Sequence, residues 1–160
     1  MRVGMGYDIH ALVSGCKLVL GGIEVPHRMG LLGHSDADVL VHALMDALLG
    51  AANLGDIGVL FPDTDPEYKG ISSLILLAEV YKKVREQNWK LENLDIVVMA
   101  EAPKLRPYIP RMVKKISDTM KILPDRISIK ATTAERLGFI GREEGIAAQA
   151  VVLLTARKEL

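Results

Sequence analysis

The sequence has little of what is typical of secreted, nucleic-acid-binding or membrane proteins. Its 160 residues include one cysteine, Cys16, so no internal disulfide can form, as is usual in a reducing compartment. Lysine plus arginine and aspartate plus glutamate both number 20, which argues against a general nucleic-acid binder and against docking on anionic membranes. The longest purely apolar stretches, such as 150–154, are far too short to span a bilayer, and no apolar signal core follows the first charge. We therefore expect a cytoplasmic protein.

Aromatic residues are also scarce, at 4% of the chain, so the core must be aliphatic. Hydrophobic residues make up 49% and charged residues 25%, which is ordinary for globular proteins. No repeat, low-complexity tract or long linker divides the sequence. The length therefore predicts one domain, residues 1–160, with a core that needs no disulfide to hold it.

Hydrophobic periodicity predicts an α/β fold. Strands are expected at 2–10, 17–20, 23–25, 94–100, 127–131 and 146–156, and helices at about 35–53, 72–87 and 107–122. Ser35 is the expected N-cap of the first helix, with Asp36 and Asp38 in its first turn, and 30–33 and 56–70 are expected loops. We expect one mixed sheet with helices packed on one face. The bare opposite face would need covering, which a homo-oligomer could provide.

Charges are segregated along this neutral chain. Between residues 29 and 68 there is no lysine or arginine, whereas two of the four histidines fall in that range. The acidic residues of the range are Asp36, Asp38, Asp46, Asp56, Asp63, Asp65 and Glu67. Such a block would repel itself if folded close, and a divalent metal is one remedy. A solvated acidic surface is the alternative, and charge alone favours it.

Three residues nevertheless form a candidate metal site. Asp8 and His10 are two residues apart in an expected strand, so both side chains point to one face. His42 lies on the first expected helix, with Asp38 and Asp46 at i−4 and i+4, from where a carboxylate can orient a ligating imidazole. One carboxylate and two imidazoles leave a fourth position open, as in catalytic zinc sites, and suit Zn²⁺ better than Mg²⁺. The pattern by itself is weak, because a lone helical histidine is more often structural.

A second candidate site follows the strand expected at 127–131. Backbone amides and the hydroxyls of Thr132 and Thr133 could hold phosphate oxygens, and Glu135 could bind a hard cation between two phosphates. A strand end followed by a helix N-cap explains the same residues, and the sequence alone favours that alternative. Lys104 and Arg106 lie in an expected loop, where they could meet a phosphate.

Several longer motifs point to one family. They are Gly6-Tyr-Asp-Ile-His10, Gly33-His-Ser-Asp-Ala-Asp38, Asp46-Ala-Leu-Leu-Gly-Ala51, Gly55-Asp-Ile-Gly58, Leu60-Phe-Pro-Asp-Thr-Asp65, Ala102-Pro-Lys104, Lys130-Ala-Thr-Thr133 with Glu135, and Leu137-Gly-Phe139. With these motifs in order, essentially the whole chain closely resembles the 2-C-methyl-D-erythritol 2,4-cyclodiphosphate synthase family of the non-mevalonate isoprenoid pathway. The additional cytidylyltransferase domain of bifunctional members is not seen, so the resemblance implies one activity.

The resemblance implies a homotrimer of α/β subunits, with sheets facing the threefold interior, helices outside and active sites between adjacent subunits. It implies that Asp8, His10 and His42 bind Zn²⁺, and that Glu135 binds Mg²⁺ or Mn²⁺ at the substrate diphosphate. Residues around the methylerythritol and its phosphate would be Asp8, His10, His34, Ser35, Asp56, Ile57, Gly58, Phe61, Pro62, Asp63, Thr64 and Asp65. Residues around the cytidine diphosphate would be Ala100, Glu101, Ala102, Pro103, Lys104, Leu105, Arg106, Thr132, Thr133, Ala134 and Glu135.

The implied reaction is intramolecular. The 2-phosphate of 4-diphosphocytidyl-2-C-methyl-D-erythritol 2-phosphate attacks the β-phosphorus, a cyclic diphosphate forms and CMP leaves, so the enzyme would be a phosphorus–oxygen lyase. Because the nucleophile is already an anionic phosphate, no serine or cysteine nucleophile is needed, and two divalent cations would offset the repulsion between anions. His34 and Thr133 would assist as hydrogen-bond donors near the transferring phosphoryl group.

The family also has a cavity on the threefold axis that can hold an isoprenoid diphosphate, and the resemblance places Phe139 and Arg142 near it. Met5, Glu143 and Gln149 depart from the family pattern, which leaves that ligand open. Two rival functions use the same residues. One is a zinc-dependent phosphohydrolase or nuclease, and the other is a trimeric binding protein without catalytic activity.

Overall fold

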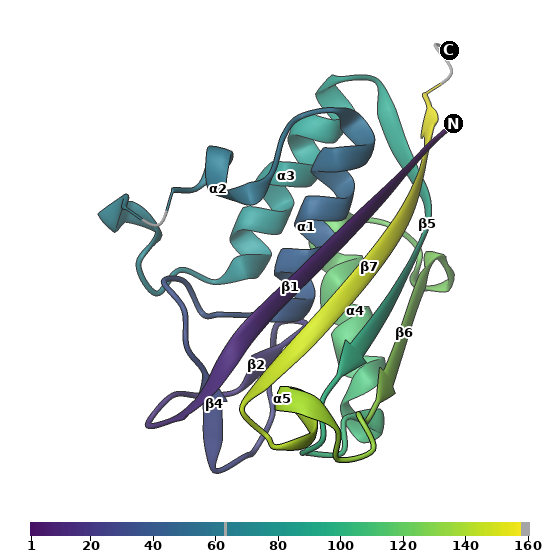
Figure 1. Cartoon of the computed structure of the whole chain (residues 1–160). Helices are drawn as coiled ribbons and strands as arrows, with labels where there is room; N and C mark the ends of the chain where they lie inside the picture. The colour runs from purple at the N-terminus through teal and green to yellow at the C-terminus, as the bar shows by residue number, and fades with distance from the viewer. Residues whose placement is uncertain (63, 158–160) are drawn as a thin grey trace.

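A mixed sheet of five strands, in the order β4-β1-β7-β5-β6, forms one layer of the fold, with the helices behind it in Figure 1. The computed structural model describes residues 1–62 and 64–157. The strands of this sheet are β1 (Arg2–Ser14), β4 (Met29–Leu31), β5 (Trp89–Met99), β6 (Ile127–Thr132) and β7 (Gly145–Ala156). Neighbouring strands are antiparallel except β5 and β6, which are parallel, so the pairing is mixed as the sequence predicts.

Three helices, α1 (Val39–Ala52), α3 (Ser73–Glu86) and α4 (Ile109–Met120), lie together on one face of the sheet (Figure 1). The shorter elements are α2 (Ile57–Leu60), α5 (Gly138–Gly141), the 3₁₀ turns η1 (Pro66–Tyr68), η2 (Arg106–Tyr108) and η3 (Pro124–Arg126), and the separate hairpin of β2 (Val19–Leu20) and β3 (Ile23–Glu24). Within the described ranges, no helix has both the length and the apolarity that crossing a bilayer requires. The prediction of a mixed sheet with helices on one face is confirmed, but the expectation of a single sheet is wrong, because the strands expected at 17–20 and 23–25 pair with each other in a separate sheet.

The two faces of the sheet differ sharply in exposure. Side chains of β7 that point to the helices, such as Ile146 and Leu154, are fully buried in an aliphatic core. On the opposite face of β1, Met5 is 63% exposed and Tyr7 is 48% exposed. The bare face that the sequence predicts is therefore present in this chain, and it carries apolar side chains.

Strand β1 lies directly against the backbone of α1. A Cβ atom at Gly4 would be 1.9 Å from the carbonyl oxygen of Ala47, and one at Gly6 would be 2.0 Å from that of Ala43. Only glycine leaves room for so close an approach. Because side chains alternate along a strand, the next even-numbered residues of β1 also point to α1.

Helix α1 begins later than the sequence predicts. Asp38, not Ser35, is its N-cap, and the Asp38 carboxylate accepts a hydrogen bond from the Val41 amide. Ala37 explains the difference, because its φ of 56° is left-handed and cannot belong to a continuous helix. Asp36 and Asp38 therefore precede the first turn instead of lying within it.

Three other predicted boundaries are also wrong. Residues 30–33 are not simply a loop, because β1 continues to Ser14 and pairs there with β4. Strand β5 begins at Trp89 and not near 94, because β7 is long enough to pair with it as far as Ala156. The expected loop at 56–70 contains α2 and η1, whose N-caps are Asp56 and Asp65.

Candidate metal centre and flanking cavities

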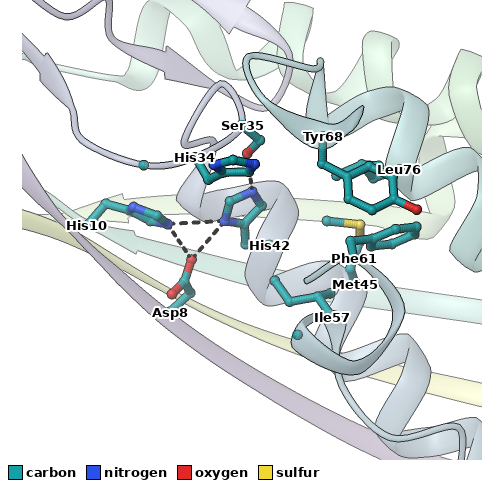
Figure 2. Close-up of a pocket in the computed structure, with 12 residues that line it drawn as sticks. Asp8, His10, His34, Ser35, His42, Met45, Ile57, Phe61, Tyr68 and Leu76 are labelled. Carbon is teal, nitrogen blue, oxygen red and sulfur yellow. Dashed lines mark hydrogen bonds and ion pairs between the residues drawn. The ribbon is translucent and has the colours of Figure 1, made fainter. Parts of the chain in front are cut away.

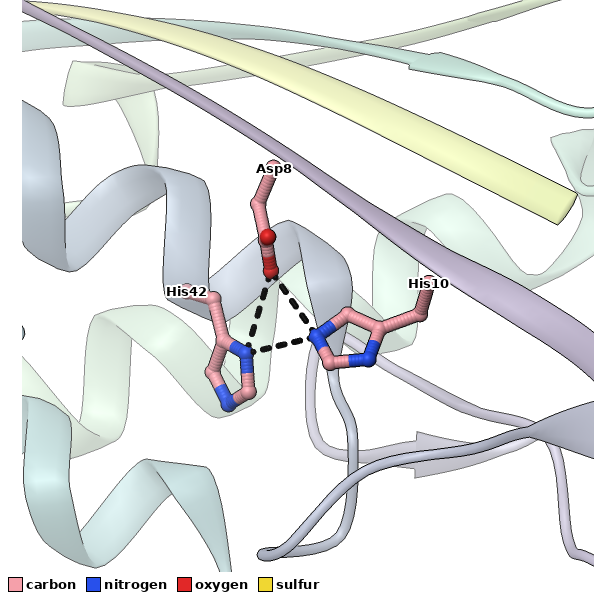
Figure 3. A group of neighbouring side chains, drawn as sticks. All are labelled: Asp8, His10 and His42. Atoms are coloured by element: carbon pink, nitrogen blue, oxygen red, sulfur yellow. Dashed lines mark hydrogen bonds and ion pairs between the residues drawn. The ribbon is translucent and has the colours of Figure 1, made fainter. Parts of the chain in front are cut away.

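Strand β1 and helix α1 bring three candidate metal ligands together (Figure 2 and Figure 3). The Oδ2 atom of Asp8 lies 3.0 Å from Nε2 of His10 and 3.1 Å from Nδ1 of His42, and the two ring nitrogens are 3.1 Å apart. Ligands about 2.0–2.1 Å from a tetrahedral zinc ion lie roughly 3.3 Å from one another. The three atoms are therefore spaced close to the corners of such a site.

The hydrogen bonding of His10 favours a cation at this point. Its Nδ1 atom is 2.7 Å from the carbonyl oxygen of Leu32, which can only accept, so Nδ1 carries the proton of the neutral ring. Nε2 then directs a lone pair at the Asp8 carboxylate, which has lone pairs of its own. These atoms repel one another unless a proton or a metal ion lies between them. One carboxylate and two imidazoles suit Zn²⁺.

Two pKa values move in opposite directions within this cluster. Burial alone would raise the pKa of Asp8, but hydrogen bonds with His10 and His42 outweigh burial and lower the pKa to about 2. Burial would lower the pKa of His10, but the hydrogen bond with Asp8 raises it. Asp8 is therefore ionised throughout the neutral range, as a metal ligand must be.

The other nitrogen of His42, Nε2, points away from the cluster toward two serine hydroxyls. The Oγ atom of Ser73 is 2.9 Å from it and that of Ser35 is 3.1 Å from it. Ser73 is completely buried, whereas Ser35 lines a cavity. The ring of His42 is therefore held from both sides.

Asp38 and Asp46 do not orient this ring, so that prediction is wrong. Asp38 is fully buried, and its carboxylate accepts hydrogen bonds from the amides of Gly21, Gly22 and the first turn of α1. Burial raises the pKa of Asp38 to about 6 against the effect of these amides. Asp46 accepts from the first amide of α2. The i−4 spacing to His42 is misleading because an N-cap side chain turns toward the amides at the helix end.

The candidate ligands form one wall of a cavity of about 230 Å³ (Figure 2). The cavity is lined by Asp8, His10, Gly33, His34, Ser35, His42, Met45, Ile57, Gly58, Phe61, Tyr68 and Leu76. Figure 2 shows the polar side chains gathered on one side and the apolar ones on the other, where the Phe61 and Tyr68 rings meet edge to face at 5.3 Å. A cavity with these two walls suits a small molecule that has a polar end and a hydrocarbon part.

Several residues expected near the methylerythritol do not line this cavity. Asp56 and Asp65 cap short helices, and the Asp65 carbonyl oxygen lies 3.0 Å from Nε2 of His34. The backbone of Asp65 therefore holds the His34 ring through its Nε2 atom. The remaining three are Pro62 and Thr64, which are not among its lining residues, and Asp63, which falls outside the described residues.

A second cavity, of about 190 Å³, lies at the carboxyl ends of β5 and β6. It is lined by Ala100, Glu101, Pro103, Lys104, Leu105, Arg106, Ala131, Thr132 and Thr133. Most residues expected around the cytidine diphosphate are thus brought together, although Ala102 and Ala134 are not among those that line it. The two cavities share no residue, and β7 lies between the strands that carry them.

The carboxylate of Glu101 holds the turn that follows β6. It accepts hydrogen bonds from the amides of Ala134 and Arg136, at 3.1 and 3.4 Å. Glu135 and Arg136 have left-handed backbones, with φ of 51° and 63°, a conformation that non-glycine residues keep only when contacts hold it. The Thr133 hydroxyl donates to the Glu135 carboxylate at 2.8 Å, so these two candidate site residues lie side by side. Glu135 itself lines neither cavity.

Phe139 and Arg142, on and after α5, also line neither cavity. Arg142 forms an ion pair of 2.9 Å with Glu144. On the bare sheet face, Nε2 of Gln149 lies 3.3 Å from the sulfur of Met5. None of these residues lines either cavity.

Sequence reasoning missed Gly33, Met45, Tyr68 and Leu76, which line the first cavity, and Ser73, which contacts His42 but does not line it. Ser72 followed by an apolar run predicts the start of α3, and Ser72 is indeed its N-cap. No spacing rule, however, places the next residue of that helix against a histidine 31 residues earlier. The apolar residues follow ordinary core periodicity and carry no separate signal.

Comparisons with known proteins find relatives over nearly the whole chain. The YgbB family model matches residues 1–155. A protein of Agathobacter rectalis named 2-C-methyl-D-erythritol 2,4-cyclodiphosphate synthase is 61% identical over 159 residues, 99% of this chain and 90% of that protein. A solved 2C-methyl-D-erythritol-2,4-cyclodiphosphate synthase in a CDP-bound form is 42% identical with a TM-score of 0.88, over 96% of this chain and 100% of that one. The bifunctional IspDF of Campylobacter jejuni is 48% identical with a TM-score of 0.94 over 97% of this chain, which spans 42% of that protein.

Proposed function

Because this chain belongs to the YgbB family and forms 2-C-methyl-D-erythritol 2,4-cyclodiphosphate in the non-mevalonate isoprenoid pathway, we propose that Asp8, His10 and His42 bind the Zn²⁺ ion that this reaction uses. The chain is an enzyme of the phosphorus–oxygen lyase class. The convergence of one carboxylate oxygen and two ring nitrogens in the wall of a cavity carries the proposal. When bound, the ion supplies positive charge that polarises a phosphoryl oxygen.

The proposed substrate is 4-diphosphocytidyl-2-C-methyl-D-erythritol 2-phosphate. A relative solved with CDP supports a nucleotide substrate. An oxygen of the 2-phosphate attacks the β-phosphorus, and the bond from that phosphorus to the oxygen of CMP breaks. CMP leaves with that oxygen, so one phosphorus–oxygen bond forms, one breaks and no water is consumed. The chain must mainly fold the substrate so that the attacking and leaving oxygens are in line.

Each cavity is proposed to bind a different part of the substrate. The first takes the methylerythritol and its phosphate, with carbon atoms against the apolar wall and His34 and Ser35 as hydrogen-bond partners of the phosphate. The second takes the cytidine diphosphate, with Lys104 and Arg106 offering positive charge to the phosphates. The Thr133 hydroxyl donates to the Glu135 carboxylate in this structure, and it is proposed to turn toward the transferring phosphoryl group and donate there when substrate binds.

Glu135 is proposed to bind a second divalent ion, Mg²⁺ or Mn²⁺. Its carboxylate lies beside the Thr133 hydroxyl, at the edge of the strand end that forms the second cavity. A carboxylate is the ligand that hard cations prefer, and Mg²⁺ is commonly held by one or two carboxylates together with substrate phosphates. Glu135 therefore suits an ion that arrives with the diphosphate.

A homotrimer is proposed to cover the bare sheet face. The exposed apolar residues of this face are Val3, Met5, Tyr7, Ile9 and Val151. They lie on two neighbouring strands, β1 and β7, so they form a continuous apolar surface of the kind that association covers. Because the two cavities share no residue within one chain, the active site is proposed to combine the first cavity of one subunit with the second cavity of its neighbour.

Subunit mixing tests the shared site. Asp8→Ala removes a metal ligand from the first cavity, and Thr133→Ala removes a hydroxyl from the second. Neither variant alone should turn over substrate well. Equal mixing of both should restore about a quarter of wild-type activity, because in a cyclic trimer about a quarter of the interfaces then pair two intact cavities. Absence of any restoration in proven mixed trimers would place the site within one chain.

The function is tested by following phosphorus NMR of the purified protein with Zn²⁺, Mg²⁺ and the cytidine diphosphate substrate. Equal release of CMP and a cyclic diphosphate is expected. Linear or inorganic phosphate in place of the cyclic product would indicate a phosphohydrolase, and no turnover by a metal-loaded trimer would indicate a binding protein.

The metal ligands are tested by zinc content and turnover of Asp8→Ala and His42→Ala. Both variants should lose zinc and nearly all activity. Asp118→Ala, which removes an exposed carboxylate on α4, is the matched control and should keep both. Full zinc content and rate in either ligand variant would refute the assignment.

Three broader expectations belong to the same proposal. The chain is proposed to work as a single domain over residues 1–160, in the cytoplasm, where its single cysteine faces no oxidant. An isoprenoid diphosphate near Phe139 and Arg142, on the threefold axis, stays a prediction.

A further inference from the structure

We propose that Ser73 and Asp36 are positioning residues for His42, which fix the ring so that Nδ1 presents its lone pair to the metal ion. The inference rests on the proposed metal site at Asp8, His10 and His42. It assigns to a serine on α3 and an aspartate before α1 the role that carboxylates next to ligating histidines have in many metal sites.

The three side chains form a chain of contacts that leads away from the metal centre. Nε2 of His42 lies 2.9 Å from Oγ of Ser73, and the Ser73 hydroxyl donates to Oδ1 of Asp36. The other oxygen of Asp36 accepts a hydrogen bond from the Ser73 amide at 3.0 Å. The carboxylate therefore accepts hydrogen bonds from both the amide and the hydroxyl of Ser73, so the position and the rotamer of the hydroxyl are fixed.

The direction of the protons follows from what each group can do. A carboxylate only accepts, so the single hydroxyl proton of Ser73 must lie between Ser73 and Asp36. Toward His42, Ser73 then offers only a lone pair, and Nε2 of the ring must be the donor. A neutral imidazole carries one ring proton, so Nδ1 is left unprotonated and faces Asp8 and His10.

Asp36 is well supported as an acceptor. Besides the two bonds from Ser73, its Oδ1 atom accepts from the amide of Asp38 at 3.2 Å. Its own amide donates to the carbonyl oxygen of Ile71 at 3.0 Å. The loop before α1 is thus hydrogen-bonded to the segment before α3. The contacts from His42 through Ser73 to Asp36 lie between the starts of these two helices.

Ser35 also contacts His42 but cannot set the tautomer in the same way. Its Oγ is 3.1 Å from Nε2, and no carboxylate accepts the hydroxyl proton in the described part of the chain. The hydroxyl can therefore rotate between donor and acceptor roles. Ser35 lines the cavity, where that freedom suits a contact with substrate.

The test compares Ser73→Ala with Ser72→Ala. Ser72 is the neighbouring N-cap of α3 and its hydroxyl accepts from the Leu74 amide, so its loss weakens the helix start without touching His42. Zinc affinity is measured on the purified protein by competition with a chelator. Ser73→Ala should bind zinc about 10–100-fold more weakly than wild type, and Ser72→Ala should stay close to wild type.

A second readout uses no metal and no activity. Long-range ¹H–¹⁵N NMR of the metal-free protein, at a pH where the rings are neutral, reports which nitrogen of His42 carries the proton. Wild type should show the proton on Nε2, and Ser73→Ala should show a gain of the form protonated on Nδ1. Asp36→Asn, whose amide can donate to Ser73 and turn its hydroxyl toward the ring, should shift the tautomer in the same direction.

Equal zinc affinity and an unchanged tautomer in Ser73→Ala would overturn the inference, as would an equal loss in Ser72→Ala. A wild-type His42 protonated on Nδ1 would overturn it by itself. Failure of the wild-type protein to bind zinc would instead refute the proposed metal site, and the tautomer would still decide the role of Ser73.

Discussion

Replacing Gly6 by alanine tests how closely β1 must lie on α1. The added methyl carbon would stand 2.0 Å from the carbonyl oxygen of Ala43 and 2.7 Å from the amide nitrogen of Ala47. A carbon atom and a carbonyl oxygen approach to about 3.3 Å, so the strand must move away by more than about 1 Å. Both neighbours are backbone atoms of a buried helix, which cannot yield as a flexible side chain would.

Two effects should follow from Gly6→Ala. Stability should fall by about 3 kcal/mol, the upper end of the usual range for overpacked sites. Asp8 and His10 move with the strand, while His42 stays on α1, and a metal site tolerates displacements of only about 0.2 Å. Zinc affinity should therefore fall at least about tenfold, since the distances of 3.1 Å from Nδ1 of His42 to Oδ2 of Asp8 and to Nε2 of His10 grow.

Gly50→Ala is the matched control for this substitution. Gly50 lies on the exposed side of the same helix, and a Cβ there would meet nothing within 4 Å. This variant should be more stable by about 0.5–1 kcal/mol and should keep its zinc, because alanine favours a helix more than glycine does. Urea unfolding and chelator competition measure both quantities. Wild-type stability and zinc affinity in Gly6→Ala would refute the close contact.

Three further predictions concern carboxylates. Glu101→Ala should leave the Ala134 amide without its acceptor and raise KM for the nucleotide substrate at least about tenfold. Glu101→Gln keeps an acceptor oxygen, so its KM should rise less. Equal KM in both variants would refute the role of Glu101 in holding the turn after β6. Glu135→Gln should raise the Mg²⁺ or Mn²⁺ concentration needed for half-maximal rate without changing zinc content, and an unchanged metal dependence would exclude Glu135 as a ligand. Hydrogen bonds, first from Lys90, lower the pKa of Glu92 from 4.5 to about 2, so its contribution to stability is present above pH 4.5 and is lost as the pH falls toward 2. Acid unfolding of Glu92→Gln should therefore be flatter in that range, and an unchanged profile would contradict this.

Much of the fold follows from local pattern, because the strands and helices obey simple periodicities. The start of α1 does not, because Ser35, Asp36 and Asp38 are all good N-caps and only the left-handed backbone of Ala37 selects the last of them. The early start of β5 at Trp89 also escapes local reasoning. It depends on pairing with the far end of β7, a partner more than sixty residues later.

The candidate metal site is likewise predictable from the sequence only in part. Alternation in β1 is enough to put Asp8 and His10 on one face, and the apolar stripe of α1 turns His42 toward that strand. The hydrogen-bond partner of His42 is different, because it comes from another helix. Helical spacing suggests Asp38 and Asp46, but tertiary packing supplies Ser73, and only the folded backbone shows which of these can reach the ring.

The contact between the glycines of β1 and the alanines of α1 also affects what happens to the protein when zinc is scarce. Zinc fingers are unfolded until the ion arrives, so chelation unfolds them. Here the strand and the helix that carry the proposed ligands are joined by the aliphatic core, so the chain should fold without zinc. A cell short of zinc should hold a folded, inactive reserve that proteases spare, and renewed supply should restore activity without new synthesis.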